Sequence, residues 1–234
     1  MLEAYALYFS GKYRDEVEFI IVPNNCSDRT SGVAAEIAMR FPQIKILDDP
    51  GKVGKGGAVM LGARSAQGEL VGFVDADGAT PHSAFKDLIE KIGNAGCIIA
   101  SRWMKGSEVE PKQPLSRRIA SRIFNTMVNL MFGLCVSDTQ CGAKLFKKEV
   151  METILPDLGL TRWAFDVDML FHVRLAGYQT VEIPTVWHDE AGSKVQVAKA
   201  SCDMTMALIR LRLLYSPFRK TIQLYNWASR KFRK

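Results

Sequence analysis

Two aspartates separated by one residue carry the strongest chemical signal in this sequence. Asp75 and Asp77 follow the apolar segment Leu70–Val74 and precede Gly78. An apolar run of this length predicts a buried strand, and the turn after it allows both carboxylates to reach one cation. Carboxylate oxygens suit Mg²⁺ or Mn²⁺, which complete their coordination with water and substrate phosphates. The pair therefore predicts a divalent-metal site that meets phosphate groups, and an exposed acidic turn is the alternative.

The segment Gly51–Gly57 is rich in glycine and lysine and is the second candidate site. Its backbone N–H groups, its two lysines and the start of a helix predicted at 58–66 all favour the binding of a phosphate. The segment lacks the Gly-Lys-Ser or Gly-Lys-Thr ending of a P-loop, so it does not predict that class of nucleotide site. A flexible turn is the alternative.

Four arginines precede or lie on a long apolar helix predicted at 117–132. They are Arg102, Arg117, Arg118 and Arg122. Residues four apart share a helix face, so Arg118 lies with Arg122 and Arg117 lies with Ser121. A basic edge on an apolar helix suits a lipid phosphate whose hydrocarbon tail follows the helix. The alternative is a core helix whose arginines extend into solvent.

Acidic residues also occur beside apolar segments at Asp138, Asp166 and Asp168. Each could serve catalysis, but Asp166 and Asp168 could equally be favourable charges in the first turn of a helix predicted at 165–175. The three histidines lie too far apart in the sequence to predict a zinc site. The nucleophile motif Gly-x-Ser-x-Gly is absent.

Strand-like and helix-like segments alternate along the chain, which predicts an α/β fold. We expect strands at 17–22, 44–47, 70–74, 97–100, 143–146 and 181–186, and helices at 31–40, 58–66, 81–92, 117–132, 165–175 and 198–215. This alternation is typical of a mostly parallel sheet with helices on both faces, here followed by a C-terminal amphipathic helix. Such sheets bind ligands at the carboxyl ends of their strands.

The composition favours one α/β domain, because 234 residues with 47% hydrophobic content are enough to bury a core. The five cysteines show no Cys-x-x-Cys spacing, which indicates reduced thiols in the cytoplasm. No secretory signal is recognisable at the start of the chain, and no apolar run is long enough to span a bilayer.

The net charge of +6 is concentrated at the end of the chain. Residues 204–234 contain eight basic side chains and no acidic one, so the first 203 residues have a net charge of −2. Aromatic and aliphatic residues alternate with these basic residues, a pattern that suits an anionic membrane surface. The alternatives are a solvated basic helix end and a nucleic-acid-binding tail, and we expect no nucleic-acid partner.

A series of motifs occurs in a fixed order between about Val17 and Tyr215. It comprises Gly54–Ala58, Asp75–Thr80, Ser101–Arg102, Asp138–Phe146, Trp163–Asp168 and Gly192–Val195. In this order the motifs resemble the family 2 glycosyltransferases that make polyprenyl-phosphate sugars, especially the dolichyl-phosphate glucosyltransferase branch and the related mannose synthases. The ordered set is much more specific than any one motif.

The resemblance implies a GT-A-type nucleotide-binding sheet and an inverting transfer of a hexose, with glucose expected, from a nucleotide sugar to a polyprenyl or dolichyl phosphate. UDP-glucose is the expected donor, and the enzyme would lie peripherally on the cytoplasmic face of a membrane. Mannosyl transfer from GDP-mannose to the same acceptors is the alternative. An inactive or partner-dependent chain is the alternative of another class.

The resemblance also implies roles for individual residues. Asp75 and Asp77 would hold Mg²⁺ or Mn²⁺, and Asp138 and Asp166 would be polar catalytic residues near the sugar. The donor would be bound by Asn24, Asp28, Lys52, Gly54, Lys55, Gly56, Asp75 and Asp77. The acceptor phosphate would be bound by Arg102, Arg117, Ser121 and Lys194. Because that acceptor is already an anion, catalysis would depend on positioning and on neutralising the leaving diphosphate.

Two departures from the family pattern are visible. Members begin with a strand and a Pro-x-Tyr-Asn-Glu-like turn, whereas Met1–Tyr5 looks like the helix after that strand. We therefore expect residues 1–214 to form an N-terminally incomplete catalytic domain with unpaired strand edges, followed by a basic aromatic tail at 215–234. The usual Asp-Asp-Gly-Ser turn is replaced by Pro23–Asp28, in which Asn24 would contact uracil or ribose without a charge.

Overall fold

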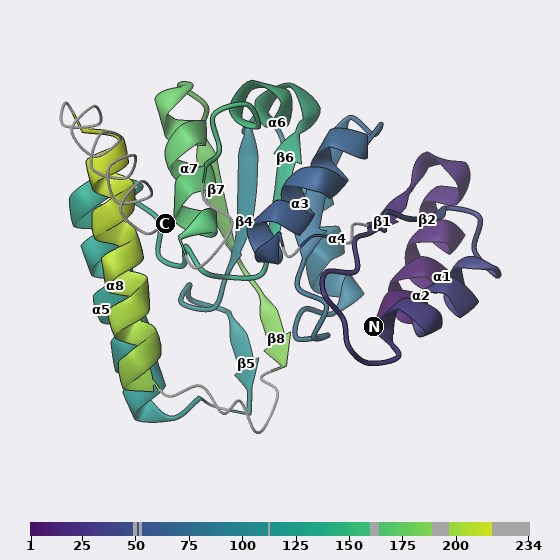
Figure 1. Ribbon diagram of the computed structural model, residues 1–234, viewed down its shortest axis with the longest axis horizontal. Coiled ribbons are helices and arrows are strands. Elements are labelled where there is room, and N and C mark those ends of the chain that lie inside the picture. Colours follow the sequence, from purple (N-terminus) through teal and green to yellow (C-terminus); the bar gives the residue numbers. More distant parts are fainter. Residues whose placement is uncertain (49–50, 52, 112, 160–163, 189–196, 217–234) are drawn as a thin grey trace, which may run out of the picture.

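A four-stranded sheet covered by helices forms the centre of the molecule (Figure 1). The computed structural model describes residues 1–48, 51, 53–111, 113–159, 164–188 and 197–216. The helices are α1 (Leu2–Tyr13), α2 (Thr30–Ala38), α3 (Gly54–Ser65), α4 (His82–Lys91), α5 (Leu115–Phe132), α6 (Lys148–Ile154), α7 (Phe165–Leu175) and α8 (Val197–Leu214). The strands are β1 (Phe19–Ile21), β2 (Ile44–Ile46), β3 (Leu70–Val74), β4 (Cys97–Ser101), β5 (Glu108–Glu110), β6 (Ala143–Lys147), β7 (Thr180–Pro184) and β8 (Val186–His188).

The central sheet has the strand order β3-β6-β4-β7. Strand β6 runs antiparallel to both of its neighbours, whereas β4 and β7 are parallel, so β3, β4 and β7 share one direction. The predicted α/β class is confirmed. The sequence did not predict that β6 would run antiparallel to the other three strands. A run of apolar residues predicts a strand, but its direction depends on how the preceding α5 and its loop return the chain to the sheet.

Both faces of this sheet are buried, as the alternation along β4 shows. Cys97 and Ile99 pack with α6 and α7, whereas Ile98 and Ala100 pack with Leu88 of α4. All five residues of β4 are buried. The prediction of helices on both faces is therefore confirmed, and burial on both faces explains why β4 is apolar throughout.

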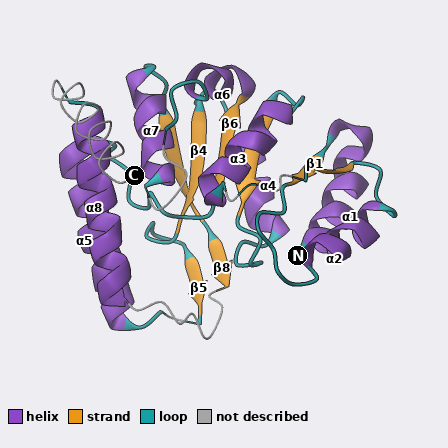
Figure 2. Ribbon diagram, in the orientation of Figure 1, coloured by secondary structure: helices purple, strands orange, loops and turns teal. Residues whose placement is uncertain are grey.

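Two smaller sheets flank the central one. Strands β1 and β2 pair in parallel, and so do β5 and β8 (Figure 2). Strand β3 pairs with β6 along one edge, and no strand of the described residues pairs with its other edge. The expected additional strand beside these edges stays a prediction.

The predicted elements agree with the structure where the apolar pattern is long. The bounds of β3 and α7 are as expected, and α1 confirms that the chain starts as a helix. The short elements β5, β8 and α6 were not predicted, because three to seven residues carry little periodicity. Helix α3 begins at Gly54, four residues earlier than expected, so half of the predicted phosphate loop is helical.

Helices α5 and α8 pack along each other at the side of the molecule (Figure 1). Phe124, Val128 and Phe132 of α5 form a cluster with Leu208 and Leu211 of α8. Among the described residues, no helix is both long and apolar enough to cross a membrane. The basic tail predicted at 215–234 lies outside the described residues from residue 217 on.

Candidate functional site

Asp75 and Asp77 lie directly after β3, at the carboxyl end of that strand. The backbone N–H of Asp75 donates to the carbonyl of Gly142 (3.0 Å), which extends the pairing of β3 with β6. Asp77 Oδ1 accepts the backbone N–H of Ala79 (3.0 Å), and Gly78 allows the turn with a φ of +82°. The Asp75 side chain is 29% exposed, and Asp77 is exposed.

This pair of carboxylates fits a hard divalent cation. Two oxygen donors one residue apart leave several coordination positions for water and phosphate oxygens, the arrangement that Mg²⁺ commonly adopts. No group of three or more His, Cys, Asp or Glu side chains with metal-site geometry occurs among the described residues. A cation bound here would therefore depend on oxygens supplied by substrate and water.

Lys55 brings a positive charge to the same place from the first turn of α3. Its Nζ lies 2.9 Å from Asp75 Oδ1 and 3.4 Å from Asp166 Oδ2. Burial opposes the charged form, but the two carboxylates outweigh it and hold the pKa of Lys55 above its ordinary value. The other predicted lysine of this segment, Lys52, lies outside the described residues.

The start of α3 is held against the start of α7 by a close contact. Gly56 is buried, and a Cβ atom added to it would lie 2.5 Å from the ring of Phe165. Gly54 opens the helix with a φ of +69°, a conformation that favours glycine. These glycines thus allow the approach that brings Lys55 to Asp166, and their role in binding a donor stays a prediction.

Asp166 and Lys144 form a buried ion pair behind Lys55. Lys144 Nζ donates to Asp166 Oδ1 and to the carbonyl of Cys141, both at 2.6 Å, and the Lys144 side chain is completely buried. Burial raises the pKa of Asp166, but Lys144 and Lys55 outweigh that effect and bring the pKa below its ordinary value. Sequence reasoning named Asp166 but missed Lys144, although a lysine inside the apolar strand Ala143–Lys147 was a usable signal.

Gly142 belongs to the motif Asp138–Phe146, and the structure shows why a glycine lies there. It precedes β6 opposite Asp75, and a Cβ atom added to Gly142 would overlap the Asp75 carboxylate. A hydrogen atom in place of a side chain therefore leaves room for the first predicted metal ligand.

Arg102 and Asp138, which were assigned to acceptor and sugar respectively, pair with each other. Arg102 Nε lies 2.8 Å from Asp138 Oδ2, and Arg102 Nη2 lies 2.9 Å from Asp138 Oδ1. The Asp138 side chain is 2% exposed. The guanidinium also lies over the ring of Trp187, 4.9 Å from its centroid. The two residues thus act as one fixed unit.

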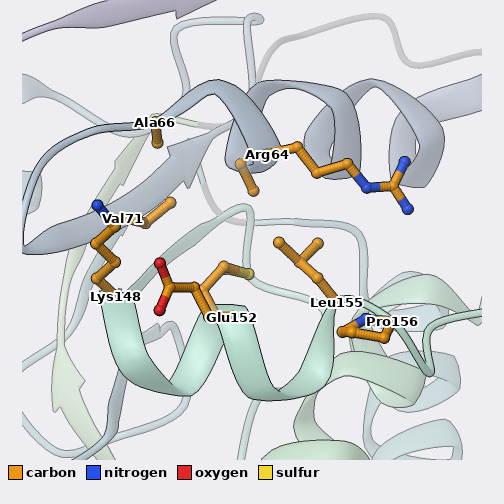
Figure 3. Close-up of a pocket in the computed structure, with 9 residues that line it drawn as sticks. Arg64, Ala66, Val71, Lys148, Glu152, Leu155 and Pro156 are labelled. Atoms are coloured by element: carbon orange, nitrogen blue, oxygen red, sulfur yellow. The ribbon is translucent and has the colours of Figure 1, made fainter.

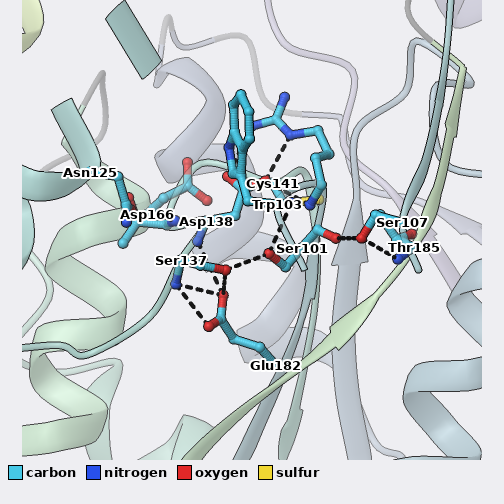
Figure 4. Close-up of polar contacts among 12 residues, drawn as sticks. Ser101, Trp103, Ser107, Asn125, Ser137, Asp138, Cys141, Asp166, Glu182 and Thr185 are labelled. Atoms are coloured by element: carbon cyan, nitrogen blue, oxygen red, sulfur yellow. Dashed lines mark hydrogen bonds and ion pairs between the residues drawn. The ribbon is translucent and has the colours of Figure 1, made fainter. Parts of the chain in front are cut away.

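A hydrogen-bonded loop holds that unit in place (Figure 4). Glu182 of β7 accepts the backbone N–H groups of Ser137 (2.8 Å) and Asp138 (3.1 Å). Ser137 Oγ is 2.8 Å from Ser101 Oγ, so the loop is also tied to β4. Glu182 is a further residue that sequence reasoning missed, because its partners lie more than forty residues away.

Arg117 and Ser121 lie on α5, beside the loop that follows β4. Trp103 of that loop contacts two other arginines of the helix, because Arg118 (6.0 Å) and Arg122 (5.3 Å) lie over its ring. The structure therefore brings the basic end of α5 close to Arg102 through its neighbour in the chain. Lys194, the fourth predicted acceptor residue, lies outside the described residues.

Asn24 and Asp28 lie in the segment between β1 and α2, and β1 belongs to a smaller sheet rather than to the central one. Asp28 Oδ1 accepts the backbone N–H of Thr30, two residues further along the chain (3.0 Å). Hydrogen bonds from Thr30 lower the pKa of Asp28. Asn24 Nδ2 is buried and has no partner among the described residues, so an amide donor is left for an acceptor group.

Within the described part of the chain, one cavity lies away from this site, and two buried thiols are unsuited to act as nucleophiles. A cavity of about 290 Å³ is lined by residues of α3, β3 and α6 (Figure 3). It includes Val71, near the beginning of β3, and thus lies at the opposite end of that strand from Asp75. Burial raises the pKa of Cys97 and Cys141 to about 12, which argues against either thiol as a nucleophile.

The solved structures that resemble this chain share its fold at low sequence identity. Glucosyl-3-phosphoglycerate synthase from Mycobacterium tuberculosis, in a complex with Mn²⁺, UDP-glucose and glycerol 3-phosphate, has a TM-score of 0.61 and 13% identity. The match covers 92% of this chain and 77% of that chain. Another crystal structure of this enzyme matches with a TM-score of 0.64 and 12% identity. At these identities the comparison shows the fold, which is of the GT-A type.

Sequence comparison finds nearer relatives. The dolichyl-phosphate beta-glucosyltransferase ALG5C of Trichomonas vaginalis is 30% identical over 91% of this chain and 67% of its own length. The dolichyl-phosphate beta-glucosyltransferase of Saccharomyces cerevisiae is 31% identical over 89% of this chain and 68% of its own length. The chain thus spans about two thirds of the length of these curated relatives.

The family model for glycosyl transferase family 2 matches residues 6–155. This range contains the Asp75–Asp77 pair, Lys55, Gly142 and the Arg102–Asp138 unit. With the GT-A-type fold and the glucosyltransferase relatives, it shows that the chain belongs to glycosyl transferase family 2.

Proposed function

We propose that this chain transfers glucose from UDP-glucose to a dolichyl or other polyprenyl phosphate at a membrane surface, with inversion at the sugar. The two carboxylates at the end of β3, with an ammonium group 2.9 Å from one of them, carry this proposal. That cluster suits a sugar donor with a diphosphate leaving group. The names of the relatives, dolichyl-phosphate beta-glucosyltransferases, support the choice of sugar and acceptor.

In this proposal Asp75 and Asp77 hold a divalent cation, which when bound supplies positive charge to the leaving diphosphate. Mg²⁺ and Mn²⁺ both suit these ligands, and Mn²⁺ accompanies UDP-glucose in a solved structure with a similar fold. Lys55 adds a second positive charge from the N-terminus of α3, where backbone N–H groups also favour an anion. Asn24, Asp28 and Lys52 remain proposed donor contacts.

The acceptor side needs positioning more than a strong base, because a phosphate monoester is already an anion near neutral pH. Asp166 is engaged by two ammonium groups, which makes it a weak base. The proposed phosphate ligands are Arg102, Arg117, Ser121 and Lys194. Arg102 is held by Asp138 in a two-point ion pair, so it presents a fixed charge.

A membrane surface is the proposed location, since the acceptor carries a hydrocarbon chain. Helix α5 exposes Leu115, Ile119 and Ile123 while burying its opposite face against α8. It carries three arginines and no acidic residue. An exposed apolar stripe with a basic border is the pattern of a helix that lies in a membrane interface. The cytoplasmic face is part of the proposal because reduced thiols suit that compartment.

Two alternatives lead to different results. Mannosyl transfer from GDP-mannose to the same acceptors would use the same carboxylates, and the glucosyltransferase relatives favour the glucose donor over it. An inactive or partner-dependent chain would keep the fold without binding the donor well.

The test is a transfer assay with anionic liposomes that contain polyprenyl phosphate, with either Mg²⁺ or Mn²⁺. Labelled UDP-glucose and GDP-mannose are supplied separately, and the label in the organic phase is counted. We expect metal-dependent transfer of glucose, and the Asp77→Ala variant should lose at least about 100-fold in rate, the scale seen when one transition-state charge stabiliser is removed. Asp87→Asn, a change at an exposed aspartate of α4, is the control and should keep full activity.

Full transfer by Asp77→Ala would contradict the role of the carboxylate pair. Transfer from GDP-mannose alone would replace glucose by mannose in the proposal. No transfer from either donor by the folded chain would favour the inactive or partner-dependent alternative.

A further inference from the structure

Lys144 lies where a lysine is rarely found, in the middle of the central sheet. It is on β6, with Phe73 of β3 on one side and Ile99 of β4 on the other. Its side chain is completely buried. Lysine is almost never fully buried unless it is paired, so its partners indicate its purpose.

The partners connect Lys144 to the candidate site in three steps. Lys144 Nζ lies 2.6 Å from Asp166 Oδ1, Asp166 Oδ2 lies 3.4 Å from Lys55 Nζ, and Lys55 Nζ lies 2.9 Å from Asp75 Oδ1. The charges alternate along this series. Exposure is 0% for the Lys144 side chain, 7% for Asp166, 42% for Lys55 and 29% for Asp75, so the first two members are buried and the last two reach solvent. The inner end is sealed, and the outer end reaches solvent beside the proposed cation site.

We infer that Lys144 is a positioning residue, which orients Asp166 so that Asp166 holds Lys55 in place for the donor diphosphate. A carboxylate with one ammonium on each oxygen has little freedom to rotate. A cation on Asp75 would compete with Lys55 for that carboxylate, and Asp166 would then be the remaining partner of Lys55. The inference rests on the proposed function, since it assigns Lys55 to the donor.

The alternative is that Lys144 and Asp166 only stabilise the core. Both explanations predict that Lys144→Met lowers the stability of the protein. The variant would leave the buried Asp166 carboxylate with Lys55, which is 3.4 Å away, as its remaining ion-pair partner among the described residues. Removing one member of a buried ion pair is strongly destabilising, whereas replacing both members is often neutral. The single variant therefore cannot separate positioning from stability, but the double variant Lys144→Met/Asp166→Asn can.

The experiment measures UDP binding in the presence of MnCl₂ by calorimetry, and thermal unfolding of the same full-length samples. We expect Lys144→Met to lower the unfolding temperature by about 10 °C, and the double variant to recover most of this loss. UDP affinity should nevertheless stay about tenfold weaker in the double variant, within the coupling seen for residues of one ion-pair network.

A cycle with Lys55→Met tests whether the effect passes through Lys55. If it does, adding the double change to Lys55→Met should weaken UDP binding no further. The control is Lys12→Met/Glu90→Gln, which removes an ion pair exposed on α1 and α4 and should leave UDP affinity unchanged.

Three results would overturn the inference. One is a double variant that is stable and binds UDP as tightly as the wild type. Another is a further loss of UDP affinity when the double change is added to Lys55→Met. The third is a double variant that stays as unstable as Lys144→Met. A wild type that binds UDP but transfers no glucose would contradict the proposed function and leave this inference intact.

Discussion

At the scale of single residues, the space around Asp75 is as important as its charge. Gly142 faces the carboxylate so closely that no side chain fits between them. The contact joins β6 to the end of β3 at the point where the proposed cation binds. The site therefore requires a glycine at position 142. A substitution there tests this requirement without changing any charge.

We predict that Gly142→Ala displaces the Asp75 carboxylate and lowers kcat/KM for transfer at least tenfold. Overpacking of a tight site costs about 1–3 kcal/mol, which is sufficient for such a loss. Steady-state kinetics across a Mn²⁺ titration would show a raised metal requirement. The control is Gly32→Ala on α2, where an added Cβ meets nothing within 4 Å. Unchanged kinetics for Gly142→Ala would mean that Asp75 has room to move.

At the scale of elements, the position of Lys55 depends on how α3 packs on α7. Gly56 contacts Phe165, the first residue of α7, and Asp166 follows it directly. A Cβ atom added to Gly62, further along α3, would meet the side chains of Val22 and Ile20 at ordinary van der Waals distances of 3.6 and 3.7 Å. Helix α3 thus contains one glycine with no room for a side chain, Gly56, and one with room for a methyl group, Gly62.

We predict that Gly56→Ala destabilises the protein by about 1–3 kcal/mol, because the new methyl group must push α3 away from Phe165. Gly62→Ala should be neutral or slightly stabilising, since alanine is the better helix former by up to about 1 kcal/mol. Urea unfolding of both variants gives the two free energies. Equal stabilities would show that α3 is not pressed against α7.

A second contact between elements joins α7 to the end of α8. Asp168 is completely buried, accepts the hydroxyl of Tyr215 (2.8 Å) and lies 3.2 Å from His172 Nδ1. Burial opposes protonation of His172, but the bonds to Asp168, with a smaller effect of Asp157, raise the pKa of His172 above its ordinary value. The protonated ring therefore stabilises the folded state.

The sign of the pH effect follows from that shift. Because the folded-state pKa of His172 is above the unfolded value of about 6.5, its contribution is full below pH 6.5 and is lost as the pH rises through the folded-state pKa. We predict that the stability difference between wild type and His172→Gln is larger at pH 5.5 than at pH 8.5. Urea unfolding at several pH values measures it, with Lys12→Met as the control, because the pKa of Lys12 is raised and that of its partner Glu90 is lowered, which moves both further from this range. A constant difference for His172→Gln would contradict the prediction.

At the scale of the whole molecule, α5 and α8 together form one side of the molecule (Figure 1). Ile119 and Ile123 of α5 are 51% and 57% exposed. Their helix also carries Arg118 and Arg122, which lie over Trp103 next to the Arg102–Asp138 unit. A lipid bound along α5 would therefore have its phosphate near the proposed acceptor residues.

We predict that Ile119→Ser/Ile123→Ser weakens binding to anionic liposomes by about tenfold or more, since burying one isoleucine contributes about 1.5–3 kcal/mol. UDP affinity should be unchanged, because both isoleucines lie on α5, whereas the proposed donor site is formed by the end of β3 and the start of α3. Flotation with liposomes and calorimetry with UDP measure the two properties. Leu7→Ser is the control, because Leu7 is equally exposed but lies on α1, on the other side of the molecule (Figure 1). Equal loss in both variants would show that α5 has no special role.

The sequence by itself determined the α/β class, the bounds of β3 and α7, and the placement of Asp75 and Asp77 after a buried strand. These features depend on runs and periods of apolar residues, which are local in the chain. The order of the motifs also indicated the family, because each motif is a continuous segment that can be recognised without knowing which residues lie near it in the structure.

Only the tertiary structure decided which of these residues meet. It placed β6 antiparallel between β3 and β4, and so brought Lys144 behind Asp166 and Gly142 against Asp75. It also paired Arg102 with Asp138 and made the second half of the predicted phosphate loop the first turn of α3. Ion pairs and close packing join residues that are far apart in the chain, and their geometry is set by the packing of whole elements rather than by local pattern.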